Sequence, residues 1–224
     1  MEGIRFAPSG DSALVAEFGT VIDEEINEQV HAMGRWITEQ KIRGVTQLLP
    51  TFRSLMVFYD PMVISYDRLV RKLRRFSPKK TEKSGEQKQI IQVPCCYDGP
   101  DLEDMQRLAH LSREEIVKIH CGTVYKIYMM GFLPGFVYLG GLDPRLCVPR
   151  LETPRTRIEP GSVGIGGSQT GVYPVASPGG WRILGRTPLK FYDPGRSEPI
   201  LCRSGQYIQF VPISREEYER QVAE

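Results

Sequence analysis

Along residues 1–76, segments with the apolar–polar pattern of a strand alternate with segments that have the pattern of an amphipathic helix. Ser12 to Phe18 is rich in strand-forming residues and alternates imperfectly, which predicts a strand. Asp23 suits the N-cap of a helix that runs to about Gln40, because its carboxylate can accept hydrogen bonds from the first N–H groups. Glu24 and Glu25 follow in the first turn, where carboxylates interact favourably with the helix dipole. Four apolar residues recur at helical spacing in that helix: Ile26, Val30, Met33 and Ile37.

Two further strands and a second helix complete this region. Val45 to Leu49 and Leu55 to Tyr59 flank a turn at Pro50 to Arg53, which predicts a hairpin. A last helix is expected from about Tyr66 to Phe76. Together these elements predict a small α+β sandwich domain over residues 1–76.

The polar stretch SPKKTEKSGEQK, residues 77–88, has no large apolar residue and predicts a linker. Beyond it, Gln89 to Cys95 predicts a strand, and Asp101 to Ala109 predicts a short helix. A second helix is expected from Ser112 to Cys121, since it begins with a Ser and a Glu at capping-box spacing.

From Thr123 onward the pattern changes to short strands, interrupted by Gly and Pro at roughly 8- to 12-residue intervals. The next helical pattern starts only near Arg215. Many short strands with regular turns are typical of a sandwich or a closed barrel. We therefore predict a β-barrel domain bearing two helices over residues 89–224.

Composition narrows the class of protein. The chain has 224 residues, of which 41% are hydrophobic and 25% charged, as in ordinary globular proteins. No apolar run approaches the ~20 residues that span a bilayer, and the N-terminus lacks the features of a signal peptide. The sequence predicts a cytoplasmic protein that does not associate with membranes.

Cysteine and charge exclude further classes. The five Cys form no C-x-x-C pair, so neither a disulfide framework nor a zinc site is indicated. A net charge of +2 argues against a nucleic-acid binder. The usual phosphate-binding, serine-hydrolase and zinc-hydrolase motifs are also missing from the sequence.

Glycine and proline concentrate between Gly131 and Pro188, where the chain has 12 Gly and 8 Pro. Aromatic residues such as Phe136 and Trp181 are interleaved with them, so the glycines serve turns and close backbone approaches rather than disorder. The run GSVGIGGSQTGVYP, residues 161–174, has two interpretations. It is either a glycine-bearing hairpin or a backbone cradle for an anion.

The same segment contains six Arg and no Lys, opposed within it only by Asp143, Glu152 and Glu159. The planar guanidinium of Arg binds a carboxylate or phosphate through two parallel bonds. This excess predicts an anionic ligand, with plain surface solvation as the alternative. His120, which ends the preceding helix, is either a general base or a structural histidine.

Two long runs make the chain recognisable: HCGTVYKIYMMGFLPGFVYLGGL and PRLETPRTRIEPGSVGIGGSQTGVYPVASPGGWRILGRTP. They closely resemble the bacterial KipI family, also called the 5-oxoprolinase B-subunit family or allophanate hydrolase subunit 1. GDSALVAEFG and FRSLMVFYDP extend the resemblance over nearly the whole chain. The resemblance implies an α+β protein with a small N-terminal α/β sandwich domain and a C-terminal cyclophilin-like β-barrel.

The resemblance also implies a multi-subunit hydrolase that opens 5-oxo-L-proline to L-glutamate with ATP and in which this chain is inactive alone. Its partners would be an A subunit of the YcsF/LamB type together with a second barrel subunit of the 5-oxoprolinase C type. ATP would act through the complex, and no metal or redox cofactor is expected. The alternatives are an inhibitor of a sporulation histidine kinase and a component of urea or allophanate degradation.

This reaction needs hydrogen-bond donors directed at developing negative charge and a guanidinium for the substrate carboxylate. His120 is the candidate catalytic residue, as a proton carrier. Six residues are candidates for substrate binding, three as anion-binding arginines and three as contacts that shape the pocket: Arg150, Arg155, Arg186, Gln169, Tyr173 and Trp181.

Overall fold

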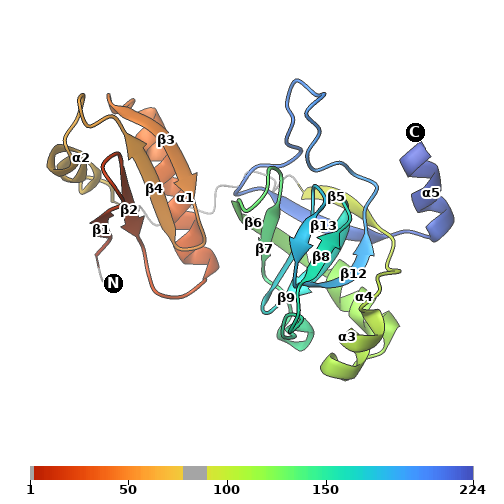
Figure 1. The fold of residues 1–224 in the computed structure, drawn as a ribbon. Helices are drawn as coiled ribbons and strands as arrows, with labels where there is room; N and C mark the ends of the chain where they lie inside the picture. The colour runs from red at the N-terminus through yellow and green to blue at the C-terminus, as the bar shows by residue number, and fades with distance from the viewer. Residues whose placement is uncertain (1–2, 78–89, 224) are drawn as a thin grey trace. The chain divides into compact units, whose positions relative to one another are not determined.

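The computed structural model describes residues 3–77 and 90–223 (Figure 1). The chain divides into two compact units, Met1–Gln87 and Lys88–Glu224, each with its own hydrophobic core. Apart from Ser77, the expected linker at residues 77–88 lies outside the described part of the chain.

In the first unit, helices cover an antiparallel sheet with the strand order β1-β2-β4-β3. The predicted strand, hairpin and helices are confirmed, and β1 is an additional edge strand that the sequence pattern did not indicate. The elements are β1 (Arg5–Pro8), β2 (Ala13–Glu17), α1 (Glu24–Glu39), β3 (Val45–Pro50), β4 (Ser54–Tyr59) and α2 (Tyr66–Leu73).

The start of α1 shows why these residues form a helix. The Asp23 carboxylate accepts hydrogen bonds from the backbone N–H groups of Glu25 and Ile26, at 2.8 and 3.1 Å. This confirms the predicted cap, which satisfies N–H groups that have no partner inside the helix. Val30, Met33 and Ile37 are buried against the sheet, and Ile26 is half-buried.

The second unit is built around a seven-stranded sheet with the order β12-β9-β10-β7-β6-β13-β5, and a small sheet pairs β11 with β8. Neighbouring strands are antiparallel except β13 and β5. The elements are β5 (Ile90–Cys95), α3 (Leu102–Ala109), α4 (Arg113–Gly122), β6 (Val124–Met130), β7 (Val137–Gly140), the 3₁₀ turn η1 (Pro144–Leu146), β8 (Arg155–Ile158), β9 (Ser162–Gly166), β10 (Gln169–Val172), β11 (Ser177–Gly179), β12 (Arg182–Arg186), β13 (Tyr207–Pro212) and α5 (Arg215–Ala223).

The sheet closes into a barrel where the chain beyond β5 returns along β12. Cys96 and Arg186 exchange backbone hydrogen bonds of 2.8 and 2.9 Å, and the Gly99 N–H donates to the Leu184 carbonyl at 2.9 Å. The backbones approach so closely that a Cβ on Gly185 would collide with the Cys96 carbonyl oxygen. Glycine at this position therefore permits closure.

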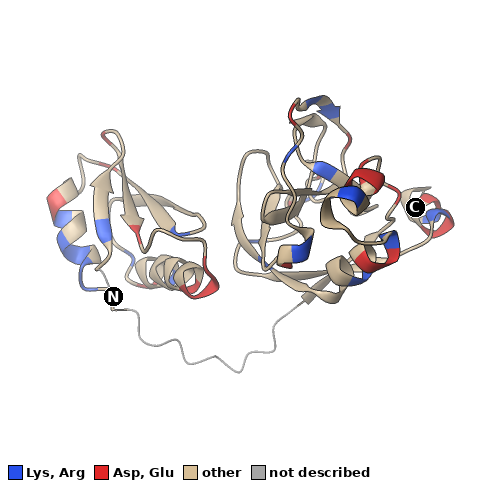
Figure 2. Ribbon diagram, turned by 90° about the horizontal axis from the view of Figure 1, so that it is seen from below, with Lys and Arg blue, Asp and Glu red and all other residues tan. Residues whose placement is uncertain are grey.

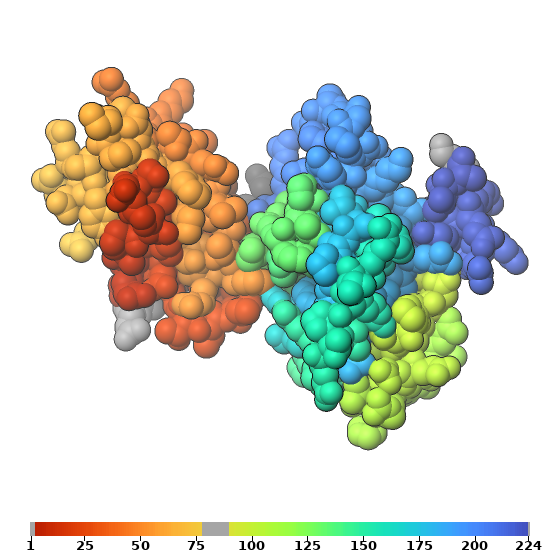
Figure 3. Space-filling model, in the orientation of Figure 1, coloured from red at the N-terminus to blue at the C-terminus, as the bar shows by residue number. Residues whose placement is uncertain are grey.

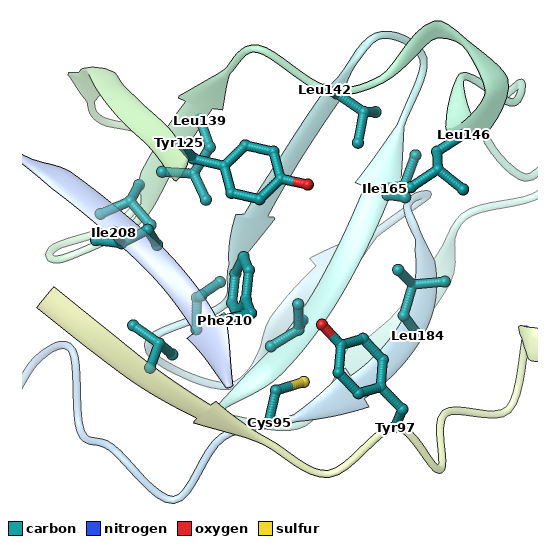
Figure 4. Packing of buried hydrophobic residues seen from close by; sticks show 14 of the residues in the cluster. Cys95, Tyr97, Tyr125, Leu139, Leu142, Leu146, Ile165, Leu184, Ile208 and Phe210 are labelled. Carbon is teal, nitrogen blue, oxygen red and sulfur yellow. The ribbon is translucent and has the colours of Figure 1, made fainter. Parts of the chain in front are cut away.

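Large apolar side chains fill the interior of the barrel (Figure 4). Tyr125 and Phe210 stand edge to face with ring centroids 5.8 Å apart, and Tyr97 and Leu184 reach the core from the closing side. The helix α4 packs on β13, and α3 packs on β12. The predicted fold class, an α/β sandwich domain followed by a β-barrel domain, is confirmed. The second unit has the two expected helices, α3 and α4, and also α5 at the helical pattern near Arg215.

The surface of the second unit has two further features. The segment between β12 and β13 rises from the barrel as an arm, held by backbone pairing of Tyr192 with Ile200 (Figures 1 and 3). Acidic and basic segments adjoin each other around α3, where Arg107 and Arg182 both contact Asp104 (Figure 2). Among the described helices, none is long and apolar enough to cross a membrane.

Replacing Gly185 with Ala should destabilise the second unit by roughly 3 kcal/mol, because the added methyl group meets backbone atoms that have little room to shift. The matched control is Gly122→Ala, since a Cβ there meets nothing within 4 Å. Urea unfolding of the two variants checks this prediction. A Gly185→Ala variant as stable as Gly122→Ala would contradict the proposed role of glycine in closure.

Candidate functional site

A second apolar cluster lies apart from the core, and we call it the aromatic cluster. Phe136, Tyr173 and Trp181 are its buried rings, Ile158 and Ile183 are its buried aliphatic members, and Leu133 and Tyr138 pack against it. The ring of Phe136 stands at right angles to that of Tyr173, with centroids 5.0 Å apart, and 5.5 Å from that of Trp181. Such edge-to-face pairs fix the ring orientations.

The glycine-rich run forms the hairpin of β9 and β10, which confirms the hairpin interpretation. A Cβ on Gly166 would collide with the indole of Trp181, so this glycine makes room for the ring. Thr170 and Gly171 point to opposite faces of β10, as strand geometry requires. Thr170 bonds His120, whereas a Cβ on Gly171 would lie 3.0 Å from Trp181.

Arg150 lies over this cluster. Its guanidinium carbon is 5.8 Å from the centre of the Trp181 ring, a cation–π distance. Burial raises the pKa of Tyr138 and raises that of Tyr173 to about 12, and the nearby positive charge of Arg150 opposes this rise in both. Arg150 is exposed, and no carboxylate of the described residues pairs with it.

Arg155 has a different environment. Its Nη2 donates to Asp101 Oδ1 at 2.6 Å, and the other Asp101 oxygen accepts from the Ile183 N–H at 2.6 Å. The Asp101 carboxyl is buried, so its charge is balanced by this ion pair. Arg155 Nη1 is buried and has no hydrogen-bond partner among the described residues.

Arg186 lies further along β12. It donates two hydrogen bonds to the Asp98 carboxylate, at 3.2 and 2.7 Å, and its guanidinium stacks over Tyr218 of α5 at 4.4 Å. The structure therefore brings Arg150 and Arg155 to the aromatic cluster and gives Arg186 a separate set of partners.

The arginine excess predicted from the sequence is largely neutralised in the fold. Five of the six arginines form ion pairs, and three of the acidic partners come from residues 98–104, which precede the arginine-rich segment. The pairs are Arg145–Asp143, Arg155–Asp101, Arg157–Glu159, Arg182–Asp104 and Arg186–Asp98. Only Arg150 of the six keeps its charge unpaired within the described chain.

Gln169, Tyr173 and Trp181 contribute to one face. Gln169 is half-buried at the start of β10, opposite Gly166, and strand alternation places it on the same face as Gly171. Tyr173 and Trp181 are almost completely buried, so they support the surface rather than line an open pocket. Two recesses on this unit, one at residues 197–204 and one at the end of α4, contain none of the predicted site residues.

His120 lies inside the barrel. Its Nδ1 is 2.7 Å from the Tyr97 hydroxyl and its Nε2 is 2.9 Å from Thr170 Oγ1. Thr170 uses its only hydrogen to donate to the Gly164 carbonyl, so it accepts from His120 Nε2–H, and Nδ1 accepts from Tyr97. The ring also stacks on Phe210, with centroids 4.6 Å apart.

Complete burial lowers the pKa of His120 from 6.5 to about 3, so the ring is neutral at neutral pH. The side chain lies on the opposite face of β10 from Trp181, because Thr170 directs it inward. The structure thus does not bring His120 together with Arg150 and the aromatic cluster. Its predicted role as a proton carrier stays a prediction.

Known proteins are similar to this chain in sequence and in fold. The family described as "Carboxyltransferase domain, subdomain C and D" matches residues 4–202. The chain belongs to this carboxyltransferase-domain family. It is similar to the B subunit of 5-oxoprolinase from Bacillus subtilis, with 41% identity over 93% of this chain and 92% of the relative, and to its Escherichia coli O157:H7 counterpart, with 34% identity over 95% and 97%.

Solved structures with a similar fold include the following two. The crystal structure of TTHA0988 superposes with a TM-score of 0.82 at 33% identity, covering 90% of this chain and 40% of that longer one. The Kluyveromyces lactis urea amidolyase superposes with a TM-score of 0.74 at 20% identity over 97% of this chain and 15% of its own, which shows a shared fold. The recognition of the family from its sequence motifs is confirmed.

The stability of the second unit should depend on pH through His120. The folded pKa lies below that of the unfolded chain, so the unfolded state takes up the proton first as pH falls below about 6.5. The contribution of neutral His120 to stability is fully present above that pH. On the acid side, the free energy of unfolding should fall by about 1.4 kcal/mol per pH unit, down towards pH 3.

Urea unfolding between pH 7.5 and 4.5 measures this slope. His120→Gln should lower stability at pH 7.5 and flatten the slope. The control His110→Asn should leave the slope unchanged, since His110 is exposed. Asn also tolerates the left-handed backbone conformation of position 110. An equal slope in wild type and His120→Gln would show that another group controls the acid sensitivity.

Asp101→Ala should destabilise the second unit by about 3 kcal/mol, because it leaves the Arg155 guanidinium and the buried Ile183 N–H without their partner. Glu159→Ala is the matched control, since its ion pair with Arg157 is exposed on both sides and should cause no measurable change. Thermal and urea unfolding compare the two. Equal stabilities would refute a central role for Asp101.

Proposed function

We propose that this chain is the B-type subunit of an ATP-dependent 5-oxoprolinase, which opens 5-oxo-L-proline to L-glutamate. The observation that carries the assignment of the site is Arg150, an exposed guanidinium over Trp181 with no paired carboxylate among the described residues. The similarity to the B subunits of three bacterial 5-oxoprolinases over almost their full length supports the reaction.

The substrate fits the chemistry of this surface. 5-Oxoproline combines a carboxylate with a compact five-membered lactam. A guanidinium binds the carboxylate through two parallel hydrogen bonds. The half-buried members of the aromatic cluster, Leu133 and Tyr138, offer an apolar wall for the ring. Arg155 and Gln169 stand beside this wall as additional polar contacts, while Arg186 is proposed only as a more distant anion contact.

ATP drives the reaction because the five-membered lactam forms spontaneously. Transfer of the γ-phosphoryl group of ATP to the lactam oxygen releases ADP and makes the carbonyl carbon electrophilic enough for water to add. The C–N bond then breaks as a proton passes to the leaving nitrogen, and hydrolysis of the resulting acyl phosphate releases glutamate and phosphate. Within the described residues no group of three or more metal-ligating side chains is assembled. We propose that ATP acts through the complex in the cytoplasm, where the partners are an A subunit of the YcsF/LamB type together with a barrel subunit of the C type.

Reconstitution tests this function. The chain alone should release no glutamate from 5-oxoproline and ATP, and the mixture with both partner subunits should release it. Allophanate assayed beside 5-oxoproline tests the alternative substrate, which the similarity to urea amidolyases suggests. Turnover of allophanate but not of 5-oxoproline by the complete mixture would disprove the proposal. The histidine-kinase alternative stays a prediction, which a pull-down with a kinase dimerisation domain tests.

Arg150→Ala should raise the KM of the complex for 5-oxoproline roughly 10- to 100-fold with little change in kcat, because it removes a charge-assisted contact present in the ground state and the transition state. Arg150→Lys should recover part of the loss, since Lys supplies charge without the planar fork. Arg157→Ala, which removes an exposed arginine already paired with Glu159, is the control and should match wild type. A KM unaffected by Arg150→Ala would remove Arg150 from the site.

A further inference from the structure

Phe132 has an unusual backbone and an unusual exposure. It stands between β6 and β7 with φ +68°, in the left-handed region that favours glycine. Its side chain is large and apolar, yet the residue is 64% exposed. Both features cost free energy in the folded state, so neither folding nor solvation accounts for a phenylalanine here.

The surrounding turn imposes this conformation. The Leu133 N–H donates to the Gly131 carbonyl at 2.8 Å, and the Phe136 N–H donates to the Leu133 carbonyl at 3.1 Å. Gly135 follows with φ +80° and lies against the backbone of Phe191 in the arm. A glycine at position 132 would meet the same backbone requirement without strain, so the aromatic ring itself requires another explanation.

The ring extends the aromatic cluster towards solvent. Phe132 stands edge to face on Phe136, with centroids 5.8 Å apart. Phe136 in turn contacts Trp181 at 5.5 Å, and Arg150 lies over Trp181 at 5.8 Å. Phe132 therefore borders the Phe136 end of this pair with an exposed aromatic ring, and Arg150 borders the Trp181 end with an unpaired positive charge.

We propose that Phe132 is a specificity-determining residue, which packs against one face of the five-membered substrate ring while Arg150 binds the substrate carboxylate. This inference rests on the proposed function and adds the feature that distinguishes a cyclic from an acyclic amide. The methylene groups of a lactam ring present apolar C–H bonds to an aromatic face, whereas allophanate, which is acyclic, presents none.

The test uses Phe132→Ala and Phe132→Gly in the complex reconstituted with both partner subunits. Loss of the apolar contact should raise the KM for 5-oxoproline roughly tenfold in both variants, with kcat nearly unchanged. Phe132→Tyr keeps an aromatic face and should keep the wild-type KM. Ile200→Ala, which removes an exposed apolar side chain outside the aromatic cluster, should also match wild type.

A stability measurement separates ligand recognition from a structural role. Because only glycine adopts φ +68° without strain, Phe132→Gly should melt about 2 to 4 °C above Phe132→Ala. Equal KM values in two variants of different stability would show that the change in KM comes from the missing ring.

Three results would overturn the inference. An active wild-type complex whose KM is unchanged in Phe132→Ala and Phe132→Gly removes Phe132 from substrate recognition and leaves the proposed function intact. Loss of partner subunits from the variants on size-exclusion chromatography would make Phe132 a docking residue instead. A wild-type complex that fails to open 5-oxoproline refutes the proposed function itself, and this inference with it.

Discussion

The buried carboxylate of Asp101 is the contact on which the candidate surface depends. Asp101 lies just before α3, next to the point where the barrel closes. One of its carboxylate oxygens accepts from the Ile183 N–H of β12 and the other from Arg155 of β8, so the carboxylate links the two strands. Both strands also supply a residue to the aromatic cluster, Ile183 from β12 and Ile158 from β8. One ion pair therefore fixes two walls of the surface, and each charge needs the other because Asp101 is buried.

Local signals in the sequence predicted the elements well, because caps and periodicity act over a few residues. The Ser112–Glu115 capping box and the Asp23 cap both form as expected. Closure of the barrel could not be predicted from such local signals. It depends on the pairing of residues 96–101 with β12, which lies more than 80 residues later in the chain. The edge strand β1 was missed because its four residues, RFAP, carry no clear alternation.

The arginine-rich segment shows why the site was only partly predictable. Counting charges within the segment gave a strong positive excess, but ion pairs form in space between residues distant in sequence. Asp98, Asp101 and Asp104 precede the segment and neutralise half of its arginines. The prediction of an anion-binding surface is therefore reduced to Arg150, which pattern alone could not distinguish from its neighbours.

The alternation of β10 separates two kinds of chemistry. On its inner face Thr170 accepts a hydrogen bond from the neutral His120 ring. On its outer face the Trp181 ring packs against the strand, and Arg150 lies over that ring. Arginine keeps its positive charge at neutral pH, and burial raises the pKa of Tyr173 to about 12, so neither group exchanges a proton at neutral pH. Opening a lactam requires proton transfer to the leaving nitrogen. The proposed reaction therefore needs a proton donor other than these outer groups, which agrees with the proposed role of this chain as one subunit of a complex.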